Sequence, residues 1–123
     1  YFLLPKKKKD NYNIYFVFFT YIIIEFLIAC LLISLEYVHS KNILHRDVKP
    51  ENLVFDERGY LHLTDFGISR IWSPKNENDT SGTPGYMAPE VMMKIGHGMA
   101  CDLFAVGVIG YECMFGKVIF LFN

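Results

Sequence analysis

The chain has 123 residues, a formal net charge of −1 and a composition that is 52% hydrophobic and 16% aromatic. This length allows at most one domain, and a charge close to zero provides no overall field that would favour nucleic acid or an acidic partner. The cysteines, Cys30, Cys101 and Cys113, are odd in number and widely spaced, with no Cys-x-x-Cys pair. We therefore expect reduced core thiols in an intracellular, cytoplasmic protein, and its function has to be inferred from local motifs.

Apolar side chains dominate the first third of the chain. A basic run at 6–9 precedes an apolar run over 14–35, which is long enough to span a bilayer, and the lysines fit a cytoplasmic flank. Glu25 lies in the middle of that run, where a carboxylate disfavours insertion into a membrane. A helix packed inside a protein lobe has the same apolar character on nearly all sides. Two alternatives therefore remain, a membrane span over 14–35 and a buried helix over 26–40, and we prefer the buried helix.

Short strands are predicted at 43–44, 53–55 and 60–63. The last two are expected to pair as a hairpin, since Gly59 supplies the permissive backbone that a tight turn needs. This hairpin would hold Asn52 and Asp65 near each other, at the ends of its two strands.

The rest of the chain combines a long loop with two helices. Residues 71–85 are rich in Ser, Pro, Asn, Asp, Thr and Gly and show no periodicity, which predicts a mobile loop, and a loop of that length usually has a function. Helices are predicted at 89–94 and at 101–115, the second closed by Gly116. The sequence thus predicts a mainly α protein with a short β-hairpin.

Two strings carry the chemistry. Residues 45–52 read His-Arg-Asp-Val-Lys-Pro-Glu-Asn, and residues 65–67 read Asp-Phe-Gly. In sequence and spacing they resemble the catalytic loop and the metal-binding motif of eukaryotic protein kinases. Residues 81–90, Ser-Gly-Thr-Pro-Gly-Tyr-Met-Ala-Pro-Glu, resemble the end of a kinase activation segment. Together these strings look like a serine/threonine kinase, nearest to the cyclic-nucleotide-dependent and calmodulin-dependent branches.

The resemblance implies a partial kinase C-terminal lobe, which is α+β in the complete domain. It covers 21–117 and is flanked by an unassigned apolar and basic segment, 1–20, and a divergent end, 118–123. The helix before the catalytic loop in such kinases is buried, which is why we prefer a buried helix to a membrane span. Because the chain begins with Tyr1, we expect it to belong to a longer or imperfectly defined parent.

The resemblance also implies ATP and Mg²⁺ as cofactors and protein serine or threonine hydroxyls as substrates. Phosphoryl transfer depends on positioning the hydroxyl and neutralising developing charge. Asp47 would orient the hydroxyl and accept its proton, and Lys49 would reach the γ-phosphate. Asn52 and Asp65 would bind Mg²⁺ through oxygen, the ligand type this cation prefers. Val54 would lie beneath the adenine ring.

Further roles follow from the same resemblance. Substrate-binding residues would be Glu51, Thr83 and Glu112, and the two glutamates would form a carboxylate pair for an arginine upstream of the phosphorylated residue. Two solvated carboxylates are the alternative.

Regulatory residues are implied as well. A hydrophobic regulatory column would be formed by His45 and Phe66 above Asp102. Arg46 would pair with a negative charge on the activation segment. That charge is either the permanent carboxylate of Asp79 or a phosphate on Thr80, and a simple solvated loop pair remains the third alternative.

Two kinase features are not found in the sequence. It contains no Gly-x-Gly-x-x-Gly loop and no Val-Ala-Ile-Lys-like strand, which cover and clamp the ATP phosphates. We therefore expect the chain alone to be inactive. A non-catalytic kinase-like binding remnant and a membrane-anchored protein are the alternatives, and the sequence indicates no oligomeric state.

Overall fold

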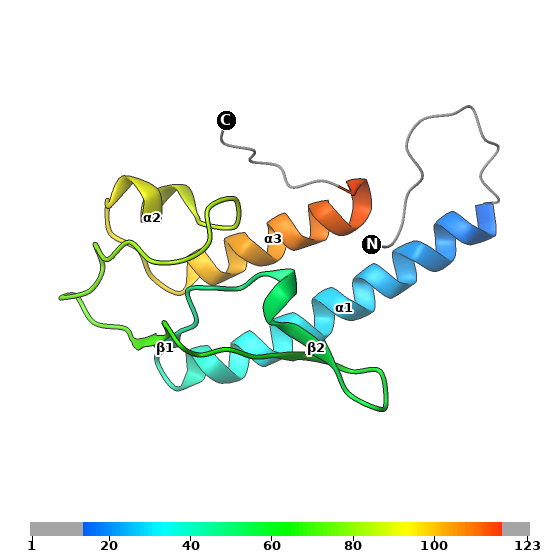
Figure 1. Cartoon of the computed structure of the whole chain (residues 1–123), viewed down its shortest axis with the longest axis horizontal. Coiled ribbons are helices and arrows are strands. Elements are labelled where there is room, and N and C mark those ends of the chain that lie inside the picture. The colour runs from blue at the N-terminus through cyan, green and yellow to red at the C-terminus, as the bar shows by residue number, and fades with distance from the viewer. Residues whose placement is uncertain (1–13, 117–123) are drawn as a thin grey trace.

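The computed structural model describes residues 14–116. Its elements are, in chain order, α1 (Ile14–Ser40), β1 (Ile43–Leu44), a 3-10 turn η1 (Pro50–Asn52), β2 (Leu53–Phe55), β3 (Leu61–Leu63), β4 (Arg70–Ile71), α2 (Pro89–Met93) and α3 (Ala100–Phe115). Figure 1 shows α1 and α3 packed along each other, with the β2–β3 hairpin beside α1 and α2 at one end. This arrangement confirms the predicted mainly α fold with a short hairpin.

Helix α1 is longer than the sequence predicted. It runs unbroken from Ile14 to Ser40 because that stretch contains no glycine or proline. Beyond its end, the backbone N–H of Lys41 bonds to the Val38 carbonyl at 3.1 Å, and Asn42 takes a left-handed φ of 59°. The predicted start at residue 26 is therefore wrong, since nothing in the preceding residues stops a helix.

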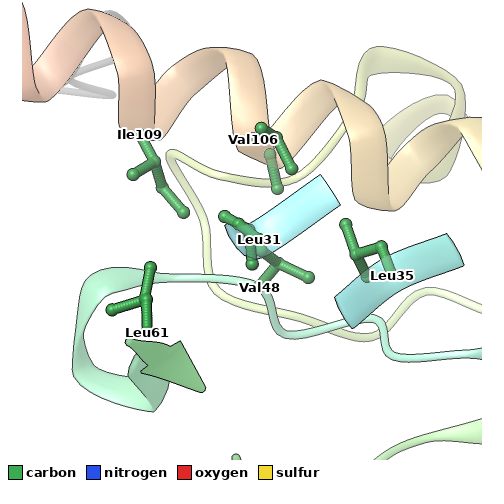
Figure 2. Close-up of a cluster of buried hydrophobic side chains, with 7 residues drawn as sticks. Leu31, Leu35, Val48, Leu61, Val106 and Ile109 are labelled. Carbon is green, nitrogen blue, oxygen red and sulfur yellow. The ribbon is translucent and has the colours of Figure 1, made fainter. Parts of the chain in front are cut away.

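One hydrophobic cluster joins the main elements of the lobe. Its buried members come from α1, the loop after β1, the hairpin and α3, and they are Leu31, Leu35, Val48, Leu61, Ala105, Val106 and Ile109 (Figure 2). Leu31 and Leu35 are only 1% and 0% exposed. Truncating such a leucine to alanine costs about 2–5 kcal/mol, so this cluster fixes the catalytic loop against both helices.

The predicted hairpin is present. Strands β2 and β3 pair antiparallel, with Leu53 opposite Leu63, and the Thr64 N–H bonds to the Asn52 carbonyl at 2.9 Å. Gly59 has a φ of 85° in the turn, as expected. Strand β3 begins at Leu61 because the N–H of Tyr60 bonds to the Asp56 side chain.

A second strand pair was not predicted. Strand β4 pairs antiparallel with β1, with Ile43 opposite Ile71, at the start of the segment predicted as a loop. Downstream, a second cluster is formed by Leu44, Ala88, Val91 and Cys101, with Trp72 packed against it. The segment between β4 and α2, residues 72–88, is called the activation segment below and is attached to the lobe at both of its ends.

The two predicted C-terminal helices are confirmed with small shifts. Helix α2 ends at Met93, where Lys94 takes a left-handed φ of 55°, and α3 begins at Ala100. Gly116 caps α3 with a φ of 68°, as predicted. The three cysteines are free thiols, and burial raises the pKa of Cys101 to about 12.

The membrane alternative rests on α1. Residues Phe18–Ser40 are long and apolar enough to cross a bilayer, and 22% of the most apolar window is buried in the lobe. The second half of the helix supplies Leu31 and Leu35 to the core, whereas Phe18 and Phe19 are 65% and 63% exposed. Ile33 and Tyr37 in the second half are also 67% and 68% exposed, so the helix predicted to be buried is covered by the lobe on one face only. The predicted segment 118–123 and the basic run 6–9 lie outside the described residues.

Candidate active site

The carboxylate of Asp102 is hydrogen-bonded to the backbone of the catalytic loop. Its side chain is 1% exposed and lies in the first turn of α3. It accepts hydrogen bonds from the backbone N–H of His45 at 2.9 Å, from the backbone N–H of Arg46 at 2.9 Å and from His39 Nε2 at 2.8 Å. Arg46 has a left-handed φ of 71°, a conformation that a non-glycine residue keeps only when its surroundings impose it.

His45 and Phe66 lie together above Asp102. The His45 side chain is fully buried, its Nε2 donates to the Thr64 carbonyl at 3.0 Å, and its Nδ1 accepts from the Asp47 N–H at 3.3 Å. The His45 and Phe66 rings meet edge to face with centroids 4.8 Å apart. The structure therefore brings together the three residues assigned to the regulatory column.

Asp47, Lys49 and Thr83 form a triangle at the mouth of the loop. The Thr83 hydroxyl donates to Asp47 Oδ1 at 2.6 Å and accepts from Lys49 Nζ at 2.8 Å. Lys49 Nζ also lies 2.8 Å from Asp47 Oδ2. A carboxylate and an ammonium thus hold one hydroxyl between them.

Both charged groups of this triangle are stabilised in their ionised forms. Partial burial raises the pKa of Asp47, but hydrogen bonds from Lys49, Thr83 and Asn52 outweigh it and leave that pKa below the ordinary value. The hydrogen bond with Asp47 raises the pKa of Lys49. Asp47 is therefore an anion at neutral pH and can accept a proton or a hydrogen bond from a hydroxyl.

Asn52 and Asp65 provide oxygen donors for a cation. Asn52 is 6% exposed, and its Nδ2 donates to the Asp47 carbonyl at 2.8 Å and to Asp47 Oδ2 at 3.1 Å, which leaves its Oδ1 as a ligand atom. Asp65 is exposed, with a φ of 59°, and its Oδ1 accepts from the Gly67 N–H at 3.1 Å. No cluster of three or more His, Cys, Asp or Glu side chains suited to a metal occurs within 14–116. Two protein oxygen donors fit Mg²⁺, which keeps several waters and takes further ligands from phosphates.

Val54 lies on the open face of the hairpin. It is 52% exposed on β2, opposite His62. The residue assigned to the adenine site therefore presents uncovered apolar surface.

Of the two glutamates assigned to substrate binding, Glu112 contacts Tyr86, whereas Glu51 is exposed to solvent. The Tyr86 hydroxyl donates to Glu112 Oε2 at 2.5 Å. Burial raises the pKa of Tyr86, and the negative charges of Glu112 and then Glu51 raise it further. The structure therefore pairs Tyr86 with Glu112. Tyr86 was not assigned a role from the sequence, although it lies in the Gly-Thr-Pro-Gly-Tyr string that drew attention to Thr83.

Asp79 reaches the arginine of the catalytic loop. Arg46 Nη1 lies 3.3 Å from Asp79 Oδ2, and Arg70 Nη1 lies 3.8 Å from the same oxygen. Arg46 is nearly buried, and its Nε donates to the Ile68 carbonyl at 2.8 Å. Thr80, beside Asp79, is exposed. Arg70 was missed from the sequence because its role depends on the β1–β4 pairing.

Gly82 allows the activation segment to touch the catalytic loop. Its φ is +132°, and a Cβ built on it would lie 2.6 Å from the Arg46 carbonyl oxygen. This close approach is what brings Thr83 over Asp47.

Comparison with known proteins identifies the family. A sequence model of the protein kinase domain matches residues 6–123. The chain is 42% identical over 108 residues to Protein kinase 3 of Dictyostelium discoideum, covering 79% of this chain and 12% of that protein. It is 42% identical over 93 residues to the cGMP-dependent protein kinase, isozyme 1, of Drosophila melanogaster, covering 75% of this chain and 12% of that protein.

The chain therefore belongs to the protein kinase family, and its relatives are serine/threonine kinases, as the motifs predicted. A second Dictyostelium relative, Developmentally-regulated protein kinase 1, is 43% identical over 98 residues, which cover 78% of this chain and 14% of that protein. The chain thus spans a small part of the length of the curated relatives that it matches.

Proposed function

We propose that this chain supplies the catalytic loop of a serine/threonine protein kinase that transfers the γ-phosphate of ATP to protein hydroxyls. The observation that carries the proposal is the position of the Thr83 hydroxyl. It donates a hydrogen bond to Asp47 Oδ1 at 2.6 Å, and the oxygen of this hydroxyl accepts one from Lys49 Nζ at 2.8 Å. A substrate hydroxyl requires the same two partners, an anion to orient it and a cation beside the incoming phosphate.

Each catalytic residue has a separate task. Asp47 orients the substrate hydroxyl and takes its proton, for which the lowered pKa keeps it ionised. Lys49 places positive charge beside the transferred phosphoryl group. Asn52 and Asp65 would hold Mg²⁺, which neutralises charge on the phosphates when bound. The amide of Asn52 also fixes the Asp47 carboxylate through its Nδ2.

Kinase activity of the full-length protein that contains this chain tests the proposal. With Mg²⁺, ATP and a mixed serine and threonine peptide library, Asp47→Asn should lower kcat by about 10²- to 10⁴-fold, the usual contribution of a positioned general base. Asp56→Asn, on the exposed hairpin turn, is the matched control and should retain full activity. Equal activity of Asp47→Asn and the unmodified protein would contradict the proposal.

A preference for arginine upstream of the target residue is part of the same proposal. The support is that Glu112 lies beside the Gly-Thr-Pro-Gly-Tyr string, where it accepts a hydrogen bond from the Tyr86 hydroxyl, and that Glu51, next to the catalytic loop, is exposed to solvent. Two carboxylates at one site bind a guanidinium well. Replacing the upstream arginine of a peptide substrate by alanine should raise KM, and Glu51→Gln should remove that difference. An equal KM for both peptides would contradict the arginine preference.

We further propose that Asp79 supplies the permanent negative charge that Arg46 requires. The support is the 3.3 Å approach of Asp79 Oδ2 to Arg46 Nη1. Thr80 phosphorylation is the alternative, since a phosphate would bring up to two negative charges to the same place. Mass spectrometry of the protein from its native cell distinguishes them, because a stoichiometric phosphate on Thr80 would contradict permanent activation by Asp79.

An intracellular location completes the proposal, and the three free thiols support it. Fractionation of native cells tests it against the membrane alternative. Extraction with the soluble fraction is expected, whereas recovery only in detergent would favour a span by α1.

A further inference from the structure

The activation segment is attached to the turn that follows α1. The Trp72 backbone N–H donates to the Asn42 carbonyl at 2.8 Å, and Asn42 Nδ2 donates back to the Trp72 carbonyl at 3.1 Å. These bonds extend the β1–β4 pairing by one residue. The first residue of the segment after β4 is therefore fixed on both of its backbone polar groups.

Asn76 closes the next turn of the segment. Its Oδ1 accepts from the Ser73 N–H at 3.1 Å, and its Nδ2 donates to the Ile71 carbonyl at 2.8 Å. Its own carbonyl accepts from the Asp79 N–H at 3.1 Å. One side chain thus folds the segment into a compact turn, and the same residue's backbone positions the carboxylate that meets Arg46.

The same segment is attached to the linker between α2 and α3. Trp72 Nε1 donates to the His97 carbonyl at 3.0 Å, and the His97 N–H donates to the Glu77 carbonyl at 2.8 Å. His97 is only 5% exposed, and its Nδ1 has no hydrogen-bond partner within the described part of the chain. The contact therefore uses the backbone of His97, and Trp72 and Asn76 are the side chains that can be tested.

We propose that Trp72 and Asn76 form a clasp that docks the activation segment on the α2–α3 linker and so positions Thr83 and Asp79 over the catalytic loop. The clasp joins the segment to Asn42 on one side and to the backbone of His97 on the other. In Figure 1 the clasped segment is the loop that leads from the β4 strand up to α2. This inference rests on the proposed kinase function, for which Trp72 and Asn76 act as positioning residues.

The ion pair of Asp79 alone is a weak restraint. The Asp79 side chain is 38% exposed, and partly exposed ion pairs contribute little because solvent screens them and two side chains must be ordered. The clasp removes most of that ordering cost, since the turn closed by Asn76 already presents Asp79. Docking of the segment is then expected without any phosphate on Thr80.

Hydrogen exchange of the unphosphorylated protein tests the clasp without needing activity. Trp72→Phe keeps an aromatic ring in the second cluster and removes the indole N–H that bonds to His97. The amides of Asp79 and His97 should exchange about five- to tenfold faster, the change expected when one hydrogen bond is lost. Unchanged exchange at both amides would overturn the clasp.

A second variant and a control keep the test independent of folding. Asn76→Asp keeps an acceptor for the Ser73 N–H and loses the donor to the Ile71 carbonyl, and the same amides should again exchange faster. Tyr60→Phe also removes one polar group from an aromatic side chain, but on the exposed hairpin, and should leave these amides unchanged. Unaltered exchange in α1 and α3 shows that each variant is folded.

Kinetics of the full-length protein separate the clasp from the proposed function. Trp72→Phe should lower kcat with little change in KM for ATP, because the clasp positions the protein substrate and the loop rather than the nucleotide. Faster exchange in a protein that has no kinase activity would support the clasp and overturn the proposed function. Protection of the Asp79 amide that is seen only after Thr80 is phosphorylated would overturn the clasp.

Discussion

The two sides of the catalytic loop each centre on an aspartate, and their hydrogen bonds differ in kind. Asp102, below the loop, accepts from two backbone N–H groups and an imidazole, and its side chain is 1% exposed. Asp47, at the mouth, accepts from three side chains and is 14% exposed. Backbone donors cannot leave without unfolding, whereas the Thr83 hydroxyl can rotate away. The loop is therefore held by backbone hydrogen bonds where it joins the core, and by side-chain hydrogen bonds that can exchange where the proposed substrate hydroxyl would bind.

The largest loss of unfolding free energy is expected when Asp102 is replaced. Asp102→Ala leaves the backbone N–H groups of His45 and Arg46 without acceptors and should cost about 2–6 kcal/mol, since each unsatisfied buried group costs about 1–3 kcal/mol, a large fraction of the stability of a small domain. Denaturant unfolding measures this change. Glu57→Ala, at an exposed position of the hairpin turn, is the control. An unfolding midpoint equal to that of the unmodified protein would mean that Asp102 is not the anchor.

Substitution of Gly82, which lies against the Arg46 carbonyl of the catalytic loop, should cause the second-largest loss of stability. Gly82→Ala places a Cβ 2.6 Å from the Arg46 carbonyl and forces alanine into a φ of +132°. We expect a loss of at least about 1–3 kcal/mol in unfolding free energy, from the strained backbone together with the clash. Gly59→Ala is a matched control, since Gly59 has a φ of +85° but nothing within 4 Å of its Cβ position. Equal losses for both variants would show that backbone strain alone matters.

Substitution of Asp47, on the side of the loop held by side-chain hydrogen bonds, should change the unfolding free energy less. Asp47→Asn keeps the size of the side chain and part of its hydrogen bonding, so the unfolding free energy should fall by only about 1 kcal/mol. Denaturant unfolding of the same preparation used for the kinase assay checks it. A loss as large as that of Asp102→Ala would remove the distinction between the two aspartates.

The smallest effect is the pH dependence contributed by Asp47. Its pKa in the folded state is lowered from 3.8, so its stabilising contribution is present above that ordinary value and is lost as the pH falls through the folded-state pKa. The difference in unfolding free energy between the unmodified protein and Asp47→Asn should therefore shrink on acidification. A difference that grows instead would mean that the folded state raises this pKa.

Much of the lobe could be predicted from sequence because its signals are local. The hairpin has its own turn residue in Gly59, and α3 has its own cap in Gly116, so both were predicted within a residue or two. The start of α1 was not, since an apolar run without a breaker carries no boundary signal. The stretch that became α1 also resembles a membrane span by composition alone.

The residues of the candidate site also differ in whether local sequence could predict them. The strings 45–52 and 65–67 resemble kinase motifs, and that resemblance assigned the acid, the lysine and the expected magnesium ligands because each string is continuous in sequence. Strand β4, Arg70 and the clasp depend on partners far along the chain, such as Asn42 with Trp72, and no local pattern predicts that pairing.

The position of Trp72 makes its fluorescence a probe of the activation segment. It is the single tryptophan of the chain, and its indole N–H bonds to the His97 carbonyl at the contact that docks the activation segment. Within this chain, indole fluorescence therefore comes from one known position. If the proposed clasp opens, the emission maximum of Trp72 and its quenching by iodide would report the undocking without a label.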